Sequence, residues 1–484
     1  MNAKTRRLLE IFEEINRIPR CSKNEEAIAR SLDAWARAKN FPSRRDRVGN
    51  LLITVPATPG SEAAPAVVIQ GHLDMVCEKT PASTHDFTRD PIRIIHDGDW
   101  IHADETTLGA DNGVALALGL ALAEDGSLTR PTLELLFTVD EETGLTGAKK
   151  LEPGFFGGRT LINLDSETEG VFTVGCAGGR DVTITRDLRF APVPDELRFT
   201  RLAVGGLCGG HSGIDIHRHR ANALKLLARV LADMPAGDDI RLVEITGGTK
   251  RNAIPRDASA RMACAVGRLT ELRKRVAEAE RTFRHEYATE RSLFISLTEE
   301  DGPTHGRKAI RPEDARTTVD LLLALPHGAA QMSPDFSDLV MTSSNLAMTH
   351  TAEGRLSVIT SQRSLNVPAL NAMSETARAI AALAGGQATT ESEYPPWTPQ
   401  LDSPLLQRCR EVYRGCYGKE PGVRAIHAGL ECAIIGDLYP DMDMISLGPT
   451  TENAHSPSER LHVPSLSHVW DFLVALLQSL SQDS

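Results

Sequence analysis

The stretch AVVIQGHLD occupies residues 66–74, and it joins a run of apolar residues directly to a histidine and an aspartate. A short, continuous apolar run of this kind is consistent with a strand that is buried within a sheet. Side chains two positions apart in an extended chain lie on the same face, so His72 and Asp74 point the same way. The sequence therefore places an imidazole and a carboxylate together at the end of a buried strand.

The rest of the first 185 residues alternates between strand and helix patterns. We expect strands at 50–55, 132–139 and 160–164, and an apolar helix at 113–125. Strands interleaved with helices predict an α/β fold with a mostly parallel sheet that helices cover on both faces. Ligands of such sheets bind outside the carboxyl ends of the strands. A functional site is therefore expected at that edge.

The chain has 484 residues, which is too long for one ordinary hydrophobic core. After residue 185 the pattern changes to extended segments, glycine clusters and charged helices, and a proline-broken connector at 394–404 brings back alternating helix and strand. We therefore expect a catalytic domain built from residues 1–185 and 396–484. An α+β lid domain at 186–395 is inserted between its two parts.

Composition narrows the classes of partner and the compartment. The net charge is −12 and no basic block is present, which argues against nucleic acid and anionic membranes as partners. The first nineteen residues have the pattern of an amphipathic helix and not of a secretory signal, and no segment is apolar enough to span a bilayer. The eight cysteines are scattered without a Cys-x-x-Cys pair, so we expect reduced thiols in a cytoplasmic protein with a small-molecule substrate.

Further nitrogen and oxygen donors lie at or just past the ends of predicted elements. They are Asp111 before the apolar helix, Glu141 and Glu142 after the strand at 132–139, Asp165 after the strand at 160–164, and His455 in the polar loop TENAHSPSE. Buried carboxylates without a counter-charge are costly, so acids that converge on one sheet edge favour bound cations. The charges of Asp111, Glu142 and Asp165, together with one hydroxide, balance two divalent ions. The sequence therefore predicts a metallohydrolase with a pair of zinc-like ions.

Each of these donors also has a plainer interpretation. Asp111 can be the N-cap of the helix that follows it, the acids at 140–142 can form a solvated turn, and His455 can be an ordinary surface histidine. Adjacent residues in extended chain point opposite ways. One of the glutamates at 141 and 142 can therefore bind metal while the other takes a proton from metal-bound water.

Five motifs, in order, carry a resemblance to a known family. GHLDMV, TTLGADNG, DEETGLTGA, INLDSE and ENAHSPSE resemble the motifs of the co-catalytic zinc peptidases, in particular the aminoacyl-histidine dipeptidases, also called Xaa-His or beta-alanyl-histidine dipeptidases. GGHSGIDIH, GGTKRNAIPR and IHAGLECAI extend the likeness over nearly the whole chain. The resemblance implies metal-dependent hydrolysis of dipeptides, preferentially Xaa-His, in peptide catabolism.

The resemblance also implies a role for each candidate in the catalytic domain. The metal ligands are His72, Asp111, Glu142, Asp165 and His455. Asp111 bridges two divalent ions, which are most simply zinc, with manganese or cobalt as alternatives. His72 and either Glu142 or Asp165 are divided between the two ions, and His455 completes the second site. Asp74 clamps His72, and Glu141 is the general base that activates a hydroxide held by both metals. A cis peptide bond is implied between Asp111 and Asn112.

In the lid domain, three residues resemble those that hold the substrate. His211 resembles a histidine that stabilises the oxyanion or the terminal carboxylate, and Asn252 and Arg363 resemble residues that hold this carboxylate, for which the arginine has suitable fork geometry. His427 and Glu431 are assigned only to the lining of the pocket. The lid is compatible with a homodimer, in which His211 acts either in its own chain or in the partner's.

Other functions fit the same residues less well. Deacylation of N-acyl amino acids uses the same metal chemistry, because that chemistry cleaves any amide. A non-catalytic scaffold of the same fold would have no reason to keep Glu141 and all five ligands. A purely structural acidic protein would require every motif to be a coincidence.

Overall fold

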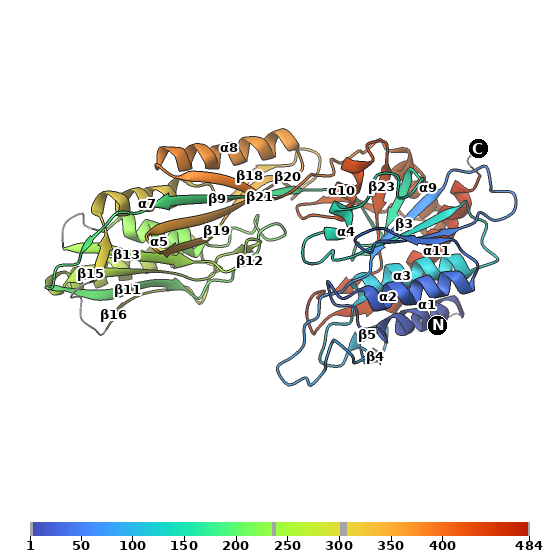
Figure 1. The fold of residues 1–484 in the computed structure, drawn as a ribbon, viewed down its shortest axis with the longest axis horizontal. Coiled ribbons are helices and arrows are strands. Elements are labelled where there is room, and N and C mark those ends of the chain that lie inside the picture. The colour runs from blue at the N-terminus through green and yellow to red at the C-terminus, as the bar shows by residue number, and fades with distance from the viewer. Residues whose placement is uncertain (1–2, 235–238, 301–306, 483–484) are drawn as a thin grey trace. The chain divides into compact units, whose positions relative to one another are not determined.

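The computed structural model describes residues 3–234, 239–300 and 307–482 (Figure 1). They fall into two compact units. The first unit consists of Met1–Gly175, Trp397–Ala425 and Leu430–Ser484, and the second of Cys176–Pro396 and Ile426–Gly429. The chain enters the second unit before residue 185, because strand β9 (Gly178–Asp187) pairs with two strands of that unit's sheet. A short return at 426–429 adds His427 to the second unit.

The first unit is built on an eight-stranded sheet. Its strand order is β1 (Ser43–Arg45), β2 (Leu51–Val55), β6 (Leu133–Thr138), β3 (Val67–His72), β7 (Thr160–Asn163), β23 (Asp443–Ser446), β8 (Val171–Cys176) and β22 (Gly422–Ile426). The central strands β6, β3, β7 and β23 run parallel, whereas β1, β2 and β8 pair antiparallel. All six residues of β3 are buried, as expected for the centre of a parallel sheet. The predicted α/β fold with a parallel-rich sheet is confirmed.

The helices of the first unit pack on this sheet and on one another. They are α1 (Ala3–Asn16), α2 (Glu26–Ala38), α3 (Ala110–Glu124), α4 (Thr146–Lys149), α9 (Pro404–Tyr417), α10 (Glu431–Leu438) and α11 (Val463–Leu480). The apolar helix α3 packs on β3 and is itself covered by α1, so nearly all of its side chains are buried. A separate antiparallel sheet consists of β24 (Thr451–Glu452), β25 (Arg460–His462), β5 (Trp100–Ala103) and β4 (Ile94–Asp97).

The second unit is an antiparallel sheet with helices. Its strand order is β16 (Phe294–Glu299), β11 (Leu197–Gly205), β15 (Ala258–Ala265), β13 (Ile240–Gly247), β19 (Val340–Ala352), β20 (Arg355–Ser364), β9 and β21 (Gln387–Tyr394), with β18 (Gly328–Met332) beside β19. The helices are α5 (Ala223–Ala232), α6 (Leu269–Glu286), α7 (Pro312–Ala324) and α8 (Val367–Leu383), and η1 (Val266–Arg268) is a short 3-10 turn. Two small ladders pair β10 (Phe190–Pro192) with β17 (Lys308–Ile310), and β12 (Gly210–His211) with β14 (Ala253–Ile254).

The prediction that all eight cysteines are reduced is wrong for one pair. Cys21 and Cys77 form a disulfide with a Cα–Cα distance of 5.7 Å. The two residues are 56 positions apart, and they meet because the segment after α1 lies beside the segment after β3, where Cys21 bridges to Met75. Such a contact between distant segments has no signature in cysteine spacing. Among the described helices, none is both long enough and apolar enough to cross a membrane.

Candidate metal centre

The predicted ligands of the first unit come together at the carboxyl ends of its central strands. His72 is the last residue of β3, Glu142 follows β6, and Asp165 follows β7. These three strands are parallel neighbours, so their carboxyl ends meet at one edge of the sheet. Asp111 lies at the start of α3, and His455 lies in the loop between β24 and β25.

Asp111 stands between two groups of donors. Its Oδ1 atom is 3.0 Å from His72 Nε2, and the same nitrogen is 3.4 Å from Asp165 Oδ1. Its Oδ2 atom is 3.0 Å from His455 Nε2, which is also 3.0 Å from Glu142 Oε1. One carboxylate thus offers an oxygen to each of two sets of ligands, and each set contains one imidazole and one further acid.

These donors fit divalent cations. In each set, one potential ligand atom per residue lies within 4.8 Å of the others. Glu142 Oε1 is buried and accepts no hydrogen bond, although His455 Nε2 is near it. A buried carboxylate oxygen without a hydrogen bond is costly unless a cation satisfies it. Imidazole nitrogen and carboxylate oxygen are ligands that zinc takes.

Without cations, protons must balance this concentration of charge. The nearby carboxylates of Asp111 and Glu142 raise the pKa of His455 to about 11. Burial lowers the pKa of His72, but Asp111, Asp165 and Asp74 outweigh burial and hold it well above its usual value. Burial raises the pKa of Asp165 to about 6. Cations that enter the site would therefore displace protons from the imidazoles.

Asp74 connects His72 to the loop of the two glutamates. Its Oδ1 atom is 3.2 Å from His72 Nδ1 and accepts a hydrogen bond from the backbone N–H of Glu141 at 3.0 Å. Its Oδ2 atom accepts from the backbone N–H of Glu142 at 3.3 Å. Burial alone would raise the pKa of Asp74, but the interaction with His72 outweighs burial and lowers this pKa to about 2. Asp74 therefore stays ionised and can hold the imidazole with its other nitrogen free to bind metal.

The three adjacent acids differ in their surroundings. Both oxygens of Asp140 accept hydrogen bonds at 2.5 Å, one from the Thr143 hydroxyl and one from the Thr146 hydroxyl. Glu141 can share a set of donor atoms with His72 and Glu142. Burial, followed by the charges of neighbouring acids, raises the pKa of Glu141 well above its usual value. A carboxylate with a raised pKa is suited to accept a proton near neutral pH.

Asp111 is not the N-cap of α3, so the plainer interpretation of that residue is wrong. The N-cap is Gly109, whose φ of 71° is in the left-handed region, and Asp111 itself has non-helical angles. The peptide bond between Asp111 and Asn112 is cis, as the resemblance implied. The Asn112 side chain accepts a hydrogen bond from the backbone N–H of His72 at 3.2 Å and donates to the carbonyl of Leu164 at 2.8 Å.

Two residues that sequence reasoning missed hold the turn before Asp111. The Glu459 carboxylate accepts hydrogen bonds from four backbone N–H groups in the segment 108–111, and the Arg20 guanidinium donates to the carbonyl of Gly109. Glu459 lies in the same motif as His455, which was the one available signal. Arg20 follows α1 and has no signal of its own.

The predicted substrate residues lie in the second unit. His211 Nδ1 accepts hydrogen bonds from the backbone N–H groups of Gly213 and Ile214 at 3.3 and 3.1 Å. Asn252 is exposed and precedes β14, which pairs with the strand of His211. Arg363 is buried in β20, and its Nη1 donates to the Tyr394 hydroxyl at 2.8 Å.

His427 joins Arg363 through a cross-strand pair. Its Nε2 is 2.7 Å from the Ser343 hydroxyl, and Ser343 lies opposite Arg363 in the pairing of β19 with β20. The side chain is 6% exposed, and burial, followed by the charge of Arg363, lowers its pKa to about 3. His427 is therefore neutral in the folded protein. We call the set His211, Ser343, Arg363, Tyr394 and His427 the recognition cluster.

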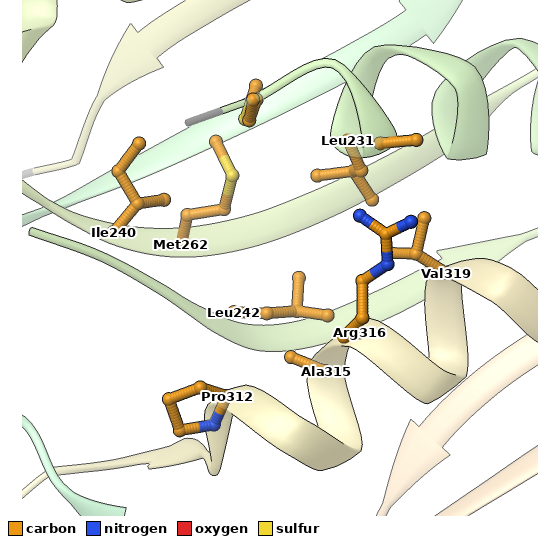
Figure 2. Close-up of a pocket in the computed structure, with 10 residues that line it drawn as sticks. Leu231, Ile240, Leu242, Met262, Pro312, Ala315, Arg316 and Val319 are labelled. Atoms are coloured by element: carbon orange, nitrogen blue, oxygen red, sulfur yellow. The ribbon is translucent and has the colours of Figure 1, made fainter. Parts of the chain in front are cut away.

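The second unit also holds an apolar cavity of about 150 Å³. Figure 2 shows side chains of α7, among them Ala315 and Val319, opposite Ile240 and Met262 of the sheet. Among the described residues that line it, Arg316 is the one charged residue, and it pairs with Asp320 at 3.0 Å. None of the candidate site residues lines this cavity.

Comparison with known proteins shows where the chain belongs. The sequence profile of peptidase family M20/M25/M40 matches residues 68–479, which is most of the chain. The protein is a member of this peptidase family. It is therefore a hydrolase that acts on peptide bonds.

Individual members of the family are also similar. The cytosol non-specific dipeptidase of Escherichia coli (strain K12) is 39% identical over 474 residues, which are 98% of this chain and 97% of that protein. The crystal structure of aminoacylhistidine dipeptidase from Vibrio alginolyticus has 39% identity and a TM-score of 0.85, and covers 98% of this chain and 96% of its own. Aminopeptidase PepT from Bacillus cereus ATCC 10987, at 17% identity and a TM-score of 0.58, covers 99% of each chain and shares the fold.

Proposed function

We propose that the protein is a metal-dependent dipeptidase that accepts Xaa-His dipeptides. The observation that carries this proposal is the position of Asp111, whose two oxygens face separate sets of imidazole and carboxylate donors. The names of the two relatives with 39% identity support a dipeptide substrate. They also favour peptide hydrolysis over deacylation of N-acyl amino acids.

We assign the metal ligands by these distances. His72 and Asp165 would hold one divalent ion, Glu142 and His455 would hold the other, and Asp111 would offer one oxygen to each. The donor set suits zinc, and manganese or cobalt are the alternatives. Two divalent ions so held would lower the pKa of a bound water and polarise the scissile carbonyl.

The protein's own groups then move the proton and hold the substrate. Glu141 accepts a proton from the attacking water and delivers it to the leaving amine. Asp74 keeps His72 oriented throughout, because its hydrogen bond fixes the ring nitrogen that faces away from Asp111. Arg363 binds the C-terminal carboxylate of the substrate, and Asn252 assists it. His211 stabilises the developing oxyanion or the same carboxylate.

Location and assembly complete the proposal. We expect the protein to act in the cytoplasm, in line with the name of the Escherichia coli relative. We also predict that the protein can form a homodimer. His211 would then act either in its own chain or in the partner subunit.

A substrate panel tests the proposed activity. The zinc-loaded protein is assayed with Xaa-His dipeptides, with other dipeptides, and with N-acetyl amino acids that lack a free amine. We expect kcat/KM for dipeptides to exceed that for N-acetyl amino acids by about 100-fold, because the two relatives with 39% identity are named as dipeptidases. Equal or higher values for the N-acetyl compounds would show that the protein is a deacylase.

A further inference from the structure

A buried arginine lies between the segment of Asp74 and the turn that leads into Asp111. Arg20 is 1% exposed and is among the largest fully buried side chains of the described chain. A buried cation is costly unless its surroundings repay the loss of hydration. Its pKa, which burial lowers to about 10, keeps it charged at neutral pH.

The hydrogen bonds of Arg20 go mainly to backbone carbonyls that adjoin two functional residues. Nη1 donates to the carbonyl of Asp74 at 2.8 Å and to that of Leu73 at 3.3 Å. Nη2 donates to the carbonyl of Gly109 at 2.6 Å and to the side chain of Asn16 at 3.3 Å. Arg20 thus joins the segment that orients His72 to the turn that leads into Asp111.

Glycines on both sides of Asp111 make room for the guanidinium. A Cβ atom at Gly109 would lie 2.6 Å from Arg20 Nη2, and one at Gly113 would lie 2.7 Å from the same atom. Real Cβ atoms do not approach other heavy atoms so closely. The turn and the arginine are therefore fitted to one another.

The Glu459 carboxylate accepts hydrogen bonds from the backbone N–H groups of the same turn. Its Oε2 atom accepts from Leu108 and Gly109 at 2.7 and 2.9 Å, and its Oε1 atom accepts from Ala110 and Asp111 at 2.8 and 3.2 Å. Glu459 is 2% exposed and lies four residues after His455. It therefore joins the loop of one proposed ligand to the backbone of the bridging one.

The negative charge of Glu459 also favours the charged form of Arg20. Arg20 feels the negative charges of Glu459, Asp74, Asp111 and Glu142. The two side chains bind opposite polarities of one backbone segment, since the arginine takes a carbonyl and the glutamate takes N–H groups. Together they connect the segments that carry Asp74, Asp111 and His455, while neither offers an atom to the two donor sets that meet at Asp111.

We infer that Arg20 and Glu459 are positioning residues of the metal centre, which fix the bridging carboxylate of Asp111 relative to His72 and His455. This inference rests on the proposed function, because it concerns the affinity of that centre for its ions. Groups that orient metal ligands without touching the metal change metal affinity by about 10- to 100-fold when they are replaced.

The test measures metal affinity separately from stability. Zinc dissociation constants are obtained by competition with a chromophoric chelator for the wild type, Arg20→Lys and Glu459→Gln, and thermal midpoints are measured on the metal-free proteins. Arg130→Lys is the matched control, because Arg130 is also a buried arginine of the first unit that donates to a backbone carbonyl, that of Pro56, but it precedes β6 and lies away from the ligands.

We expect Arg20→Lys and Glu459→Gln to weaken zinc binding by at least about 10-fold, and Arg130→Lys to leave it unchanged whatever it does to the thermal midpoint. Zinc affinities of both variants within twofold of the wild type would overturn the inference, even if their midpoints fall. If Arg20→Lys does not fold, Glu459→Gln decides the question alone. A wild-type protein that binds no zinc would instead refute the proposed function.

Discussion

The first and second units gather polar groups in opposite ways. At the metal centre, carboxylates outnumber imidazoles, and at least one buried carboxylate oxygen accepts no hydrogen bond. In the recognition cluster, His427 is neutral and pairs with a serine hydroxyl, and the charged group is the Arg363 guanidinium. The first arrangement suits cations and the second suits an anion. The charges of the two clusters thus agree with their proposed roles, metal binding in the first unit and binding of the substrate carboxylate in the second.

Replacement of the proposed general base, Glu141, should have the largest effect on turnover. We expect Glu141→Gln to lower kcat by about 10³-fold, because general acid–base catalysis contributes about 10² to 10⁴, while the bound metal stays at the wild-type level. Steady-state kinetics and elemental analysis measure the two quantities. Glu142→Gln is the matched control, since this neighbouring glutamate is a proposed ligand and its replacement should reduce the bound metal. Retained turnover in Glu141→Gln would refute the assignment of the base.

The next effect should come from the cation of the recognition cluster. Arg363→Lys keeps the charge but loses the planar fork, so we expect KM for dipeptides to rise by about 10- to 100-fold, as the loss of a charge-assisted hydrogen bond of about 1.5–3 kcal/mol implies. The value of kcat should change little. Dipeptide amides, which lack the carboxylate, serve as control substrates, and Arg363→Lys should treat them as the wild type does. An equal loss on acids and amides would mean that Arg363 has another role.

The smallest effect concerns the neutral histidine. Burial lowers the pKa of His427 to about 3, whereas an unfolded histidine titrates near 6.5. Between about pH 6.5 and 3, His427 is protonated in the unfolded chain but neutral in the folded chain. The contribution of the neutral histidine to the free energy of unfolding is therefore lost as the pH falls from 6.5 towards 3. The thermal midpoint of the metal-free wild type should drop more between pH 7.5 and 5 than that of His427→Gln. Parallel curves for the two proteins would contradict this account.

Much of the first unit could be predicted from the sequence, because its elements follow local patterns. Strands β3, β6 and β7 and helix α3 are mostly apolar, and each strand leads into a proposed ligand. The convergence of these ligands then follows from the rule that parallel strands share a carboxyl edge.

Features that depend on contacts between distant segments could not be predicted. Arg20 and Glu459 meet at the turn before Asp111 from opposite ends of the chain, and Cys21 meets Cys77 only because two loops lie side by side. The contact of His427 with Ser343, and through it with Arg363, depends on the pairing of β19 with β20. Such contacts arise from tertiary packing and leave no periodic pattern in the sequence.

The most direct test of the account is the number of divalent ions bound per chain at equilibrium. Zinc is added to the metal-free protein, the free ion is removed by dialysis against a weak chelator, and the bound metal is determined by elemental analysis. Two ions per chain in the wild type, with a reduced content after replacement of Asp111 by Asn, are the expected result. Wild-type protein that retains no zinc, or an Asp111→Asn variant that retains as much as the wild type, would contradict the account.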